Sequence, residues 1–213
     1  MDRYSEDLDF SLLKPDSGFA LSKYHNAVRV ELEAMGFEAQ VTVKHFLQVA
    51  APADLVRRVH HQANLKIKFE IDIDPPPDFA TENVAVLRPV AFSVRAYTLP
   101  DLFAGKISAI LCRQWKHRIK GRDWYDLIFY VARNIPLNLI HLKQRLIQSK
   151  FISSDQALTP ETVKKCLNDK LDGLDLESAK VDVLPYLRDK RNMDGWTKDL
   201  FKAVIQRIQV TPD

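Results

Sequence analysis

The sequence has 213 residues, of which 46% are hydrophobic and 28% are charged, and its formal net charge is +3. This composition is typical of a globular protein that is long enough to bury a substantial core, as one domain or as a core domain with a helical extension. No apolar run approaches the roughly 18 residues of a membrane span, and the N-terminus lacks the layout of a signal peptide, so we expect a cytosolic protein without a membrane partner.

The chain begins with charged and apolar side chains in alternation. Successive side chains of a strand point to opposite faces, so Asp7 and Asp9 are expected to share one face and Leu8 and Phe10 the other. Two interpretations fit: a metal-binding pair of carboxylates on a sheet, or a solvated edge strand. The spacing alone favours the second, because any half-exposed strand alternates in this way.

A turn, a helix and a strand are predicted next. Lys14–Gly18 has the composition of a turn, Phe19–Met35 carries apolar residues at helical spacing before Gly36, and Glu38–Ala50 alternates like a strand. A short amphipathic segment is expected at Leu55–His61.

The segment LKIKFEIDID, residues 65–74, has the clearest period-two pattern in the chain. Its polar face carries Glu70 and Asp72, which therefore point the same way. Pro75–Pro77 ends the predicted strand, because proline cannot donate to the hydrogen-bond ladder.

The second half of the chain is predicted to be helical. After a short strand at Ala91–Tyr97, the helices expected from apolar spacing are Leu99–Trp115, Arg122–Arg133, Leu137–Lys150, Thr159–Leu171 and Trp196–Gln209. Strands followed by helices predict an α/β protein of the α+β kind. We expect a domain boundary near Thr98, which gives a core at residues 1–98 and a helical region at 99–213.

The predicted helix at Leu99–Trp115 places a lysine on its apolar stripe. Lys106 lies among Leu102, Phe103 and Ile110, and Leu99 is expected to belong to the same stripe. An unpaired buried ammonium is costly, so this side chain either meets a negative partner, such as a phosphate, or reaches solvent from the margin of the stripe.

A basic cluster follows at residues 113–122 around Gly121. Its Arg113 and Arg122 are candidates for contact with a nucleotide or an RNA backbone, with Trp115 and Trp124 as stacking surfaces; the alternative is an ordinary charged loop. Asp123 stands where the first turn of a helix favours an acid, so a helix cap is its default role.

Other catalytic motifs are not found in the sequence. Cys112 and Cys166 lack the spacing of zinc ligands or of a disulfide framework, and His60 and His61 have no third ligand at a usual spacing. The chain contains neither a G-x-x-x-x-G-K-[ST] loop nor a G-x-G-x-x-G fingerprint.

Four motifs in this order, RYSEDLDF, LKIKFEIDIDPP, LFAGKISAILCR and KGRDWYDL, resemble the AbiEii/AbiGii toxin family of nucleotidyltransferases. That family belongs to the DNA polymerase beta-like nucleotidyltransferase superfamily. The resemblance implies a mixed sheet with flanking helices, and a toxin of a toxin–antitoxin or phage-defence system. It further implies transfer of a nucleoside monophosphate from NTP to an acceptor such as tRNA with Mg²⁺ or Mn²⁺, and an antitoxin protein as a partner.

The resemblance also assigns roles to individual residues. Asp7 and Asp9 match the paired metal carboxylates, and Glu70 matches the acid of the later strand, with Asp72 as its rival on the same face. Lys106 matches the lysine that binds phosphate, and Asp123 matches the acid of the R-D-x-Y-D-L motif. Further nucleotide contacts are expected from Ser5, Arg113 and Arg122.

One element of the family pattern is missing. Its members carry a Gly-Gly-Thr or Gly-Ser element before the paired acids, whereas none of the six residues before Asp7 is glycine. We therefore expect either that the natural protein is longer or that nucleotide binding is weakened. The rival hypotheses are a non-catalytic module that binds RNA or an antitoxin, and a metal-dependent phosphohydrolase.

Overall fold

The computed structural model describes residues 3–5, 7–34, 38–40, 48–50, 68–88, 90–113 and 119–212. The chain forms two compact units: an N-terminal unit of residues 4–75, and a helical unit of residues 1–3 and 76–213. The chain passes from the N-terminal unit to the helical unit between Pro75 and Pro76, before the domain boundary expected near Thr98. The expected domain boundary stays a prediction.

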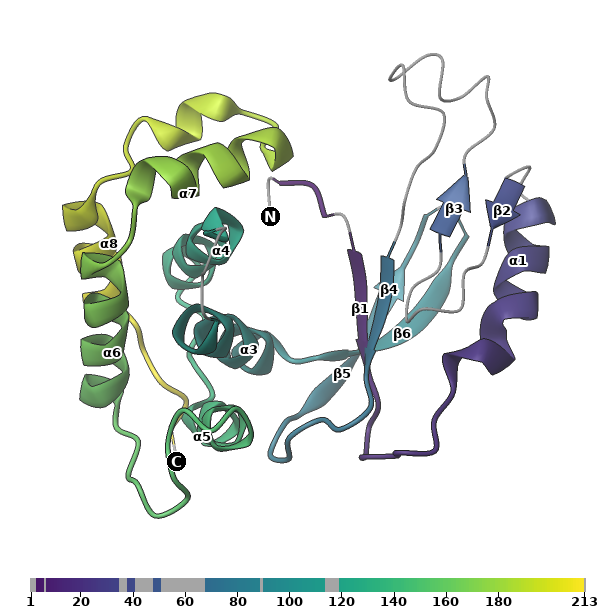
Figure 1. The fold of residues 1–213 in the computed structure, drawn as a ribbon, viewed down its shortest axis with the longest axis horizontal. Helices are drawn as coiled ribbons and strands as arrows, with labels where there is room; N and C mark the ends of the chain where they lie inside the picture. The colour runs from purple at the N-terminus through teal and green to yellow at the C-terminus, as the bar shows by residue number, and fades with distance from the viewer. Residues whose placement is uncertain are drawn as a thin grey trace. The chain divides into compact units, whose positions relative to one another are not determined.

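The described part of the N-terminal unit forms two strand pairs and one α-helix (Figure 1). Its elements are β1 (Asp7–Ser11), the 3₁₀ helix η1 (Leu21–Tyr24), α1 (His25–Ala34), β2 (Glu38–Gln40), β3 (Gln48–Ala50) and β4 (Lys68–Asp72). Strands β1 and β4 pair in parallel, and β2 and β3 pair antiparallel. A parallel pair requires a long crossover connection, and here the chain between residues 11 and 68 supplies it.

The alternation predicted for the first strand is confirmed by β1 and β4. The apolar face holds Phe10 and Phe69, whose rings stack with their centroids 5.9 Å apart. The predicted helix at Phe19–Met35 begins later than expected, because a 3₁₀ turn precedes α1. The predicted segment Leu55–His61 and the first residues of the alternating segment, 65–67, lie outside the described residues.

The helical unit combines an antiparallel strand pair with helices (Figure 1). Its elements are β5 (Thr81–Val86), β6 (Phe92–Tyr97), α3 (Leu99–Cys112), α4 (Gly121–Ala132), α5 (Leu139–Gln148), α6 (Pro160–Asp172), α7 (Leu176–Val183), the 3₁₀ helices η2 (Leu184–Tyr186) and η3 (Lys190–Met193), and α8 (Lys198–Gln206). The fold is therefore α+β, as predicted, and the described strands form three two-stranded pairs. The parallel and antiparallel pairs are separate sheets, so the mixed sheet that the resemblance implied is not formed among the described residues.

Among the described strands and α-helices, β5 and α7 were not predicted from the sequence, and the single strand predicted at Glu38–Ala50 is instead the two paired strands β2 and β3. Strand β5 lacks a clear alternation, and it forms because it pairs with β6 along its whole length, from Thr81 opposite Tyr97 to Val86 opposite Phe92. Helix α7 is only eight residues long, and Asp175 caps its N-terminus by accepting the Ser178 N–H. Both signals were too short to detect by periodicity.

The core lies among the helices, where α3 packs against α4, α5 and α6. On α3 the large buried apolar side chains are Phe103, Ile107, Ile110 and Leu111, at helical spacing. The prediction that Leu99 and Leu102 belong to the buried stripe was wrong, because their side chains are 44% and 38% exposed. The buried stripe of α3 starts at Phe103, where the neighbouring helices make contact.

Helices α4 and α7 approach each other closely at Gly121. A Cβ atom placed on Gly121 would lie 1.9 Å from the backbone oxygen of Ala179, so the backbone of one helix would have to move. We expect Gly121→Ala to lower the free energy of unfolding by about 1–3 kcal/mol. Chemical denaturation followed by tryptophan fluorescence measures this change.

The control for this substitution is Gly105→Ala in α3. A Cβ atom at Gly105 would meet only the Arg145 side chain, at 3.7 Å or more. Replacing glycine by alanine inside a helix then stabilises by up to about 1 kcal/mol. Equal effects of the two substitutions would contradict the close approach at Gly121.

A buried polar network joins α5 to the segment before β5. The fully buried imidazole of His141 contacts the Pro77 carbonyl oxygen through Nδ1, at 2.8 Å, and accepts the Arg145 Nε–H at Nε2, at 2.9 Å. The nearby Asp101 accepts from the Ala80 N–H at 3.1 Å and from the Asn138 amide at 2.7 Å. These contacts define a neutral His141 that donates through Nδ1.

The neutral state of His141 predicts a pH dependence of stability. Burial lowers the pKa of His141, and the charge of Arg145 adds to this effect, although the Pro77 hydrogen bond and the charges of Asp101 and Asp78 oppose it. A lowered pKa means that the unfolded chain binds the proton first. Stability is therefore complete above the unfolded pKa of about 6.5 and falls as the pH drops from there through the folded pKa.

We expect the denaturation midpoint to fall between about pH 7 and about pH 5, with a shallower slope in His141→Gln. Urea denaturation across this range measures both. Identical slopes for the two proteins would exclude His141 as the titrating group.

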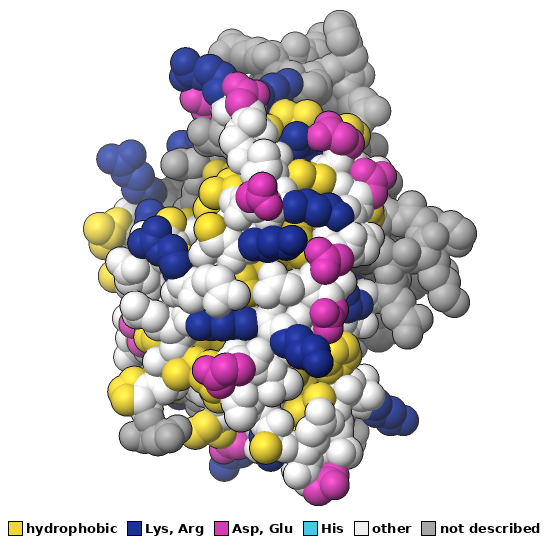
Figure 2. Space-filling view, turned by 90° about the vertical axis from the view of Figure 1, so that its left-hand side faces the viewer, with side chains coloured by type: hydrophobic (Ala, Val, Ile, Leu, Met, Phe, Trp, Pro, Cys, Tyr) yellow, Lys and Arg dark blue, Asp and Glu magenta, His cyan; other side chains and the backbone are white. Residues whose placement is uncertain are grey.

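The face of the helical unit over α6 and α8 carries charges of both signs, interspersed (Figure 2). Lys202 and Asp172 form one such pair, at 3.9 Å. A mixed arrangement is typical of a solvated surface. Within the described ranges, the helices all lack the combination of length and apolar character that crossing a bilayer requires.

Candidate functional site

The first candidate site is a row of carboxylates on the polar face of β1 and β4, which we call the carboxylate face (Asp7, Asp9, Glu70 and Asp72). The parallel register places Asp9 directly opposite Glu70 and Ser11 opposite Asp72. Side chains opposite each other in a strand pair point to the same face. The structure thus brings together the acids that the sequence placed on one face of each strand.

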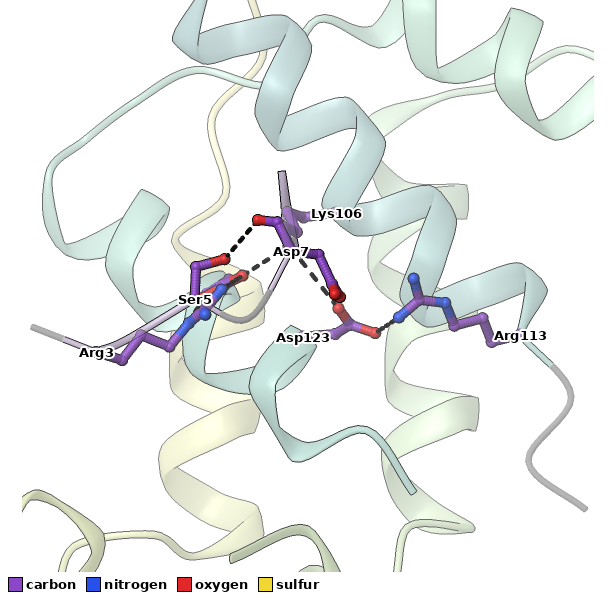
Figure 3. A network of polar contacts seen from close by, with 7 residues as sticks. Arg3, Ser5, Asp7, Lys106, Arg113 and Asp123 are labelled. Atoms are coloured by element: carbon purple, nitrogen blue, oxygen red, sulfur yellow. Dashed lines mark hydrogen bonds and ion pairs between the residues drawn. The ribbon is translucent and has the colours of Figure 1, made fainter. Parts of the chain in front are cut away.

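The two rival acids of β4 differ in their surroundings. Asp72 accepts the backbone N–H of Asp74 at 3.1 Å, which closes the turn after the strand. Glu70 faces Asp9 across the pair. At the other end of the face, the Ser5 hydroxyl donates to the backbone oxygen of Asp7 at 3.2 Å, so Ser5 lies beside the start of β1 (Figure 3).

The carboxylate face offers the hard oxygen donors that Mg²⁺ and Mn²⁺ prefer. Asp9, Glu70 and Asp72 are exposed, and Asp7 is half-buried. Among the described residues, no three acidic, histidine or cysteine side chains already converge closely enough to hold one ion. The donor chemistry and the register fit a divalent cation, and binding it requires the carboxylates to draw together.

The second candidate site is a group of five charged side chains on the helical unit, which we call the charged cluster (Arg3, Lys106, Arg113, Asp123 and Asp126). Asp126 of α4 is fully buried. Its Oδ1 accepts from Arg3 Nε at 2.7 Å, and its Oδ2 accepts from Arg3 Nη2 at 2.6 Å and lies 2.8 Å from Lys106 Nζ. The Asp126 carboxylate therefore pairs with two cations, and its contact with Arg3 is bidentate.

Asp123, one turn before Asp126 on α4, completes the charged cluster (Figure 3). It is 3% exposed, it accepts from Arg113 Nη1, and it lies 4.0 Å from Lys106 Nζ. Asp123 is an acid of the first turn of α4, as expected, but it is not the cap of the helix, because Lys120 is the N-cap and no described side chain caps α4. Its charge in the first turn still suits the helix dipole.

The environment of Asp126 changes the proton affinity of its neighbours. Burial lowers the pKa of the Arg3 guanidinium, but the hydrogen bond and charge of Asp126 and the charge of Asp123 together raise it above its usual value. Burial and the charge of Asp126 raise the pKa of Tyr130 to about 12, although Arg3 opposes this shift. Arg3 is therefore a permanent cation, and Tyr130 stays protonated.

The structure tests the predictions for Lys106 and Trp124, and the two alternatives for Lys106, a negative partner and contact with solvent, both hold in part. Lys106 meets a negative partner, as one interpretation required, and its side chain is 33% exposed. The prediction that Trp124 is a stacking surface was wrong, because its ring is fully buried and packs edge-on against Phe201. Trp115 lies outside the described residues, and Arg122 places its guanidinium 4.2 Å from the Tyr186 ring centre.

Sequence reasoning missed Arg3 as a partner of Asp126. The two residues are 123 positions apart, and nothing local in the sequence links them. The one available signal was the spacing Arg-x-Ser-x-Asp-x-Asp at residues 3–9, which places an arginine at a fixed distance before the paired acids.

An α+β fold that carries a carboxylate face and a group of clustered cations is typical of enzymes that act on nucleoside triphosphates. The comparisons identify the class. A family model described as "Nucleotidyl transferase AbiEii toxin, Type IV TA system" matches residues 1–207. The chain belongs to this family of nucleotidyltransferase toxins. The comparison with curated proteins and that with solved structures returned no match.

Proposed function

We propose that this chain is a metal-dependent nucleotidyltransferase that transfers a nucleoside monophosphate from NTP to an RNA acceptor, with tRNA as the expected acceptor. The observation that carries the proposal is the register of the carboxylate face, in which Asp9 and Glu70 are directly opposed on neighbouring parallel strands. Membership of the AbiEii family supports the class of reaction.

The cation in this proposal is Mg²⁺ or Mn²⁺. Asp7, Asp9 and Glu70 would hold it, and Asp72 is the second candidate on β4 because Ser11, and not a carboxylate, lies opposite it on β1. When bound, such an ion neutralises phosphate charge and orients the oxygen atoms that attack and leave.

The proposed reaction exchanges one bond at the α-phosphorus for another. The acceptor hydroxyl oxygen forms a bond to this phosphorus, the bond to the oxygen that bridges the α- and β-phosphates breaks, and pyrophosphate leaves. A carboxylate of the carboxylate face takes up the hydroxyl proton. In-line displacement of this kind depends mostly on positioning and on neutralising charge.

The cations of the helical unit are assigned to the triphosphate. Lys106 and Arg113 have side chains that are 33% and 43% exposed, so both keep a surface for an anion while they pair with buried aspartates. Ser5 and Arg122 are assigned to further nucleotide contacts. Asp123 orients this group of cations rather than contacting the reacting atoms.

The partners follow from the same assignment. A toxin of a toxin–antitoxin pair requires an antitoxin protein that limits its activity, and NTP and tRNA place the reaction in the cytoplasm.

The test is transfer of label from each α-labelled ribonucleoside triphosphate to total tRNA in the presence of Mg²⁺. We expect labelled tRNA and released pyrophosphate, both abolished by chelation of the metal. Labelled mononucleotide without labelled tRNA would indicate hydrolysis. Binding of NTP or RNA without either product would indicate a non-catalytic module.

A further inference from the structure

Arg3 is a buried cation for which neither the family match nor the proposed reaction gives a role. Its side chain is 10% exposed, and both of its donor groups described above point to Asp126. A backbone bridge between Arg3 and Leu187 also fixes its main chain on the helical unit. Arg3 therefore has little surface for a substrate.

The described side chains of the charged cluster carry one positive charge in excess. Arg3, Lys106 and Arg113 are positive and Asp123 and Asp126 are negative, and Asp123 lies 4.0 Å from Lys106 Nζ in addition to its pair with Arg113. Since the side chains of Arg3 and Lys106 are 10% and 33% exposed, the excess positive charge is accessible on the side of Lys106.

Removal of Arg3 would change what Lys106 offers to an anion. Asp126 would then be left with Lys106 as its described cation, and an ion pair of one lysine and one carboxylate is neutral. A neutral pair attracts phosphate less than a lysine whose carboxylate partner is already neutralised by a second cation.

We infer that Arg3 is a positioning residue: it neutralises Asp126, which fixes Lys106 on α3, and thereby leaves the Lys106 ammonium charged toward the triphosphate of the substrate. The inference rests on the proposed function, because it takes NTP as the ligand of Lys106. It adds a role for an arginine that lies four residues before Asp7 in the chain.

The test compares Arg3→Ala, Arg3→Lys and the double variant Arg3→Ala/Asp126→Asn in the full chain. Isothermal titration with each of the four ribonucleoside triphosphates and Mg²⁺ gives Kd, and label transfer gives kcat and KM. We expect Arg3→Ala to weaken NTP binding about tenfold, and Arg3→Lys to stay within about threefold because it keeps the charge. The double variant should bind NTP more tightly than Arg3→Ala, because Lys106 then faces a neutral amide.

The double variant separates this role from a merely structural one. If Arg3 only stabilised the fold, the loss of a second partner would weaken NTP binding further rather than restore it. The matched control is Arg29→Ala, which removes an exposed arginine from its pair with Glu33 on α1 and should leave Kd unchanged. Thermal unfolding of each variant shows whether the variants rank differently in stability and in NTP affinity.

The outcomes also separate this inference from the proposed function. NTP affinity that falls in Arg3→Ala and recovers in the double variant supports the inference even if no label reaches tRNA, in which case the proposed reaction is wrong. If label is transferred but NTP affinity is unchanged in Arg3→Ala, the inference alone is overturned. The same holds if label is transferred and the double variant binds NTP more weakly than Arg3→Ala. A chain that binds none of the four nucleotides overturns both.

Discussion

Asp9→Asn is expected to reduce label transfer to tRNA by at least about a hundredfold while leaving the fold intact. The side chain is exposed and lies directly opposite Glu70, so the amide costs little packing. It does remove a charged oxygen donor from the proposed cation site. A loss confined to kcat, with NTP binding measured separately, would place Asp9 in the chemical step.

The same assay ranks the two acids of β4. We expect Glu70→Gln to approach the loss seen for Asp9→Asn, because Glu70 is the residue opposite Asp9. Asp72→Asn should have a smaller effect, because Ser11, and not a carboxylate, lies opposite Asp72 on β1. Glu82→Gln, an exposed carboxylate on β5, is the control and should leave transfer unchanged. Full transfer by Asp9→Asn would contradict the carboxylate face as the cation site.

Asp126→Ala is expected to lower the free energy of unfolding by about 3 kcal/mol. The substitution leaves the largely buried Arg3 without the carboxylate that accepts both of its described hydrogen bonds, and it leaves a cavity in place of a fully buried side chain. Because Lys106 is partly exposed, its ammonium can be hydrated once Asp126 is removed. The expected loss of stability is therefore at the lower end of the range for a broken buried ion pair.

Urea denaturation followed by the fluorescence of Trp124 and Trp196, both buried in the helical unit, measures this loss. The matched control is Glu33→Ala, which breaks the exposed pair with Arg29 and should change stability by less than about 0.5 kcal/mol. Similar effects of the two substitutions would mean that the buried position of Asp126 contributes nothing beyond a surface ion pair.

Periodicity in the sequence was sufficient to predict two of the strands and five of the helices. The alternation of residues 7–11 and 68–72 predicted β1 and β4, and helical spacing predicted α3, α4, α5, α6 and α8 to within a few residues. Strand β5 and helix α7 were not predicted, because β5 depends on its pairing with β6 and α7 is short. The stripe on α3 was predicted one turn too long, since sequence cannot show where neighbouring helices begin to cover it.

The sequence by itself determined the α+β class, the face that Asp7 and Asp9 share, the common face of Glu70 and Asp72, and the resemblance to the AbiEii family. These depend on local geometry and on motif order, which the chain carries in its own spacing. Only the tertiary structure decided that Asp9 stands opposite Glu70, that Trp124 is buried, and that Asp126 joins Lys106 to Arg3. Register, burial and ion pairs between distant residues arise when elements pack together, so no local pattern can encode them.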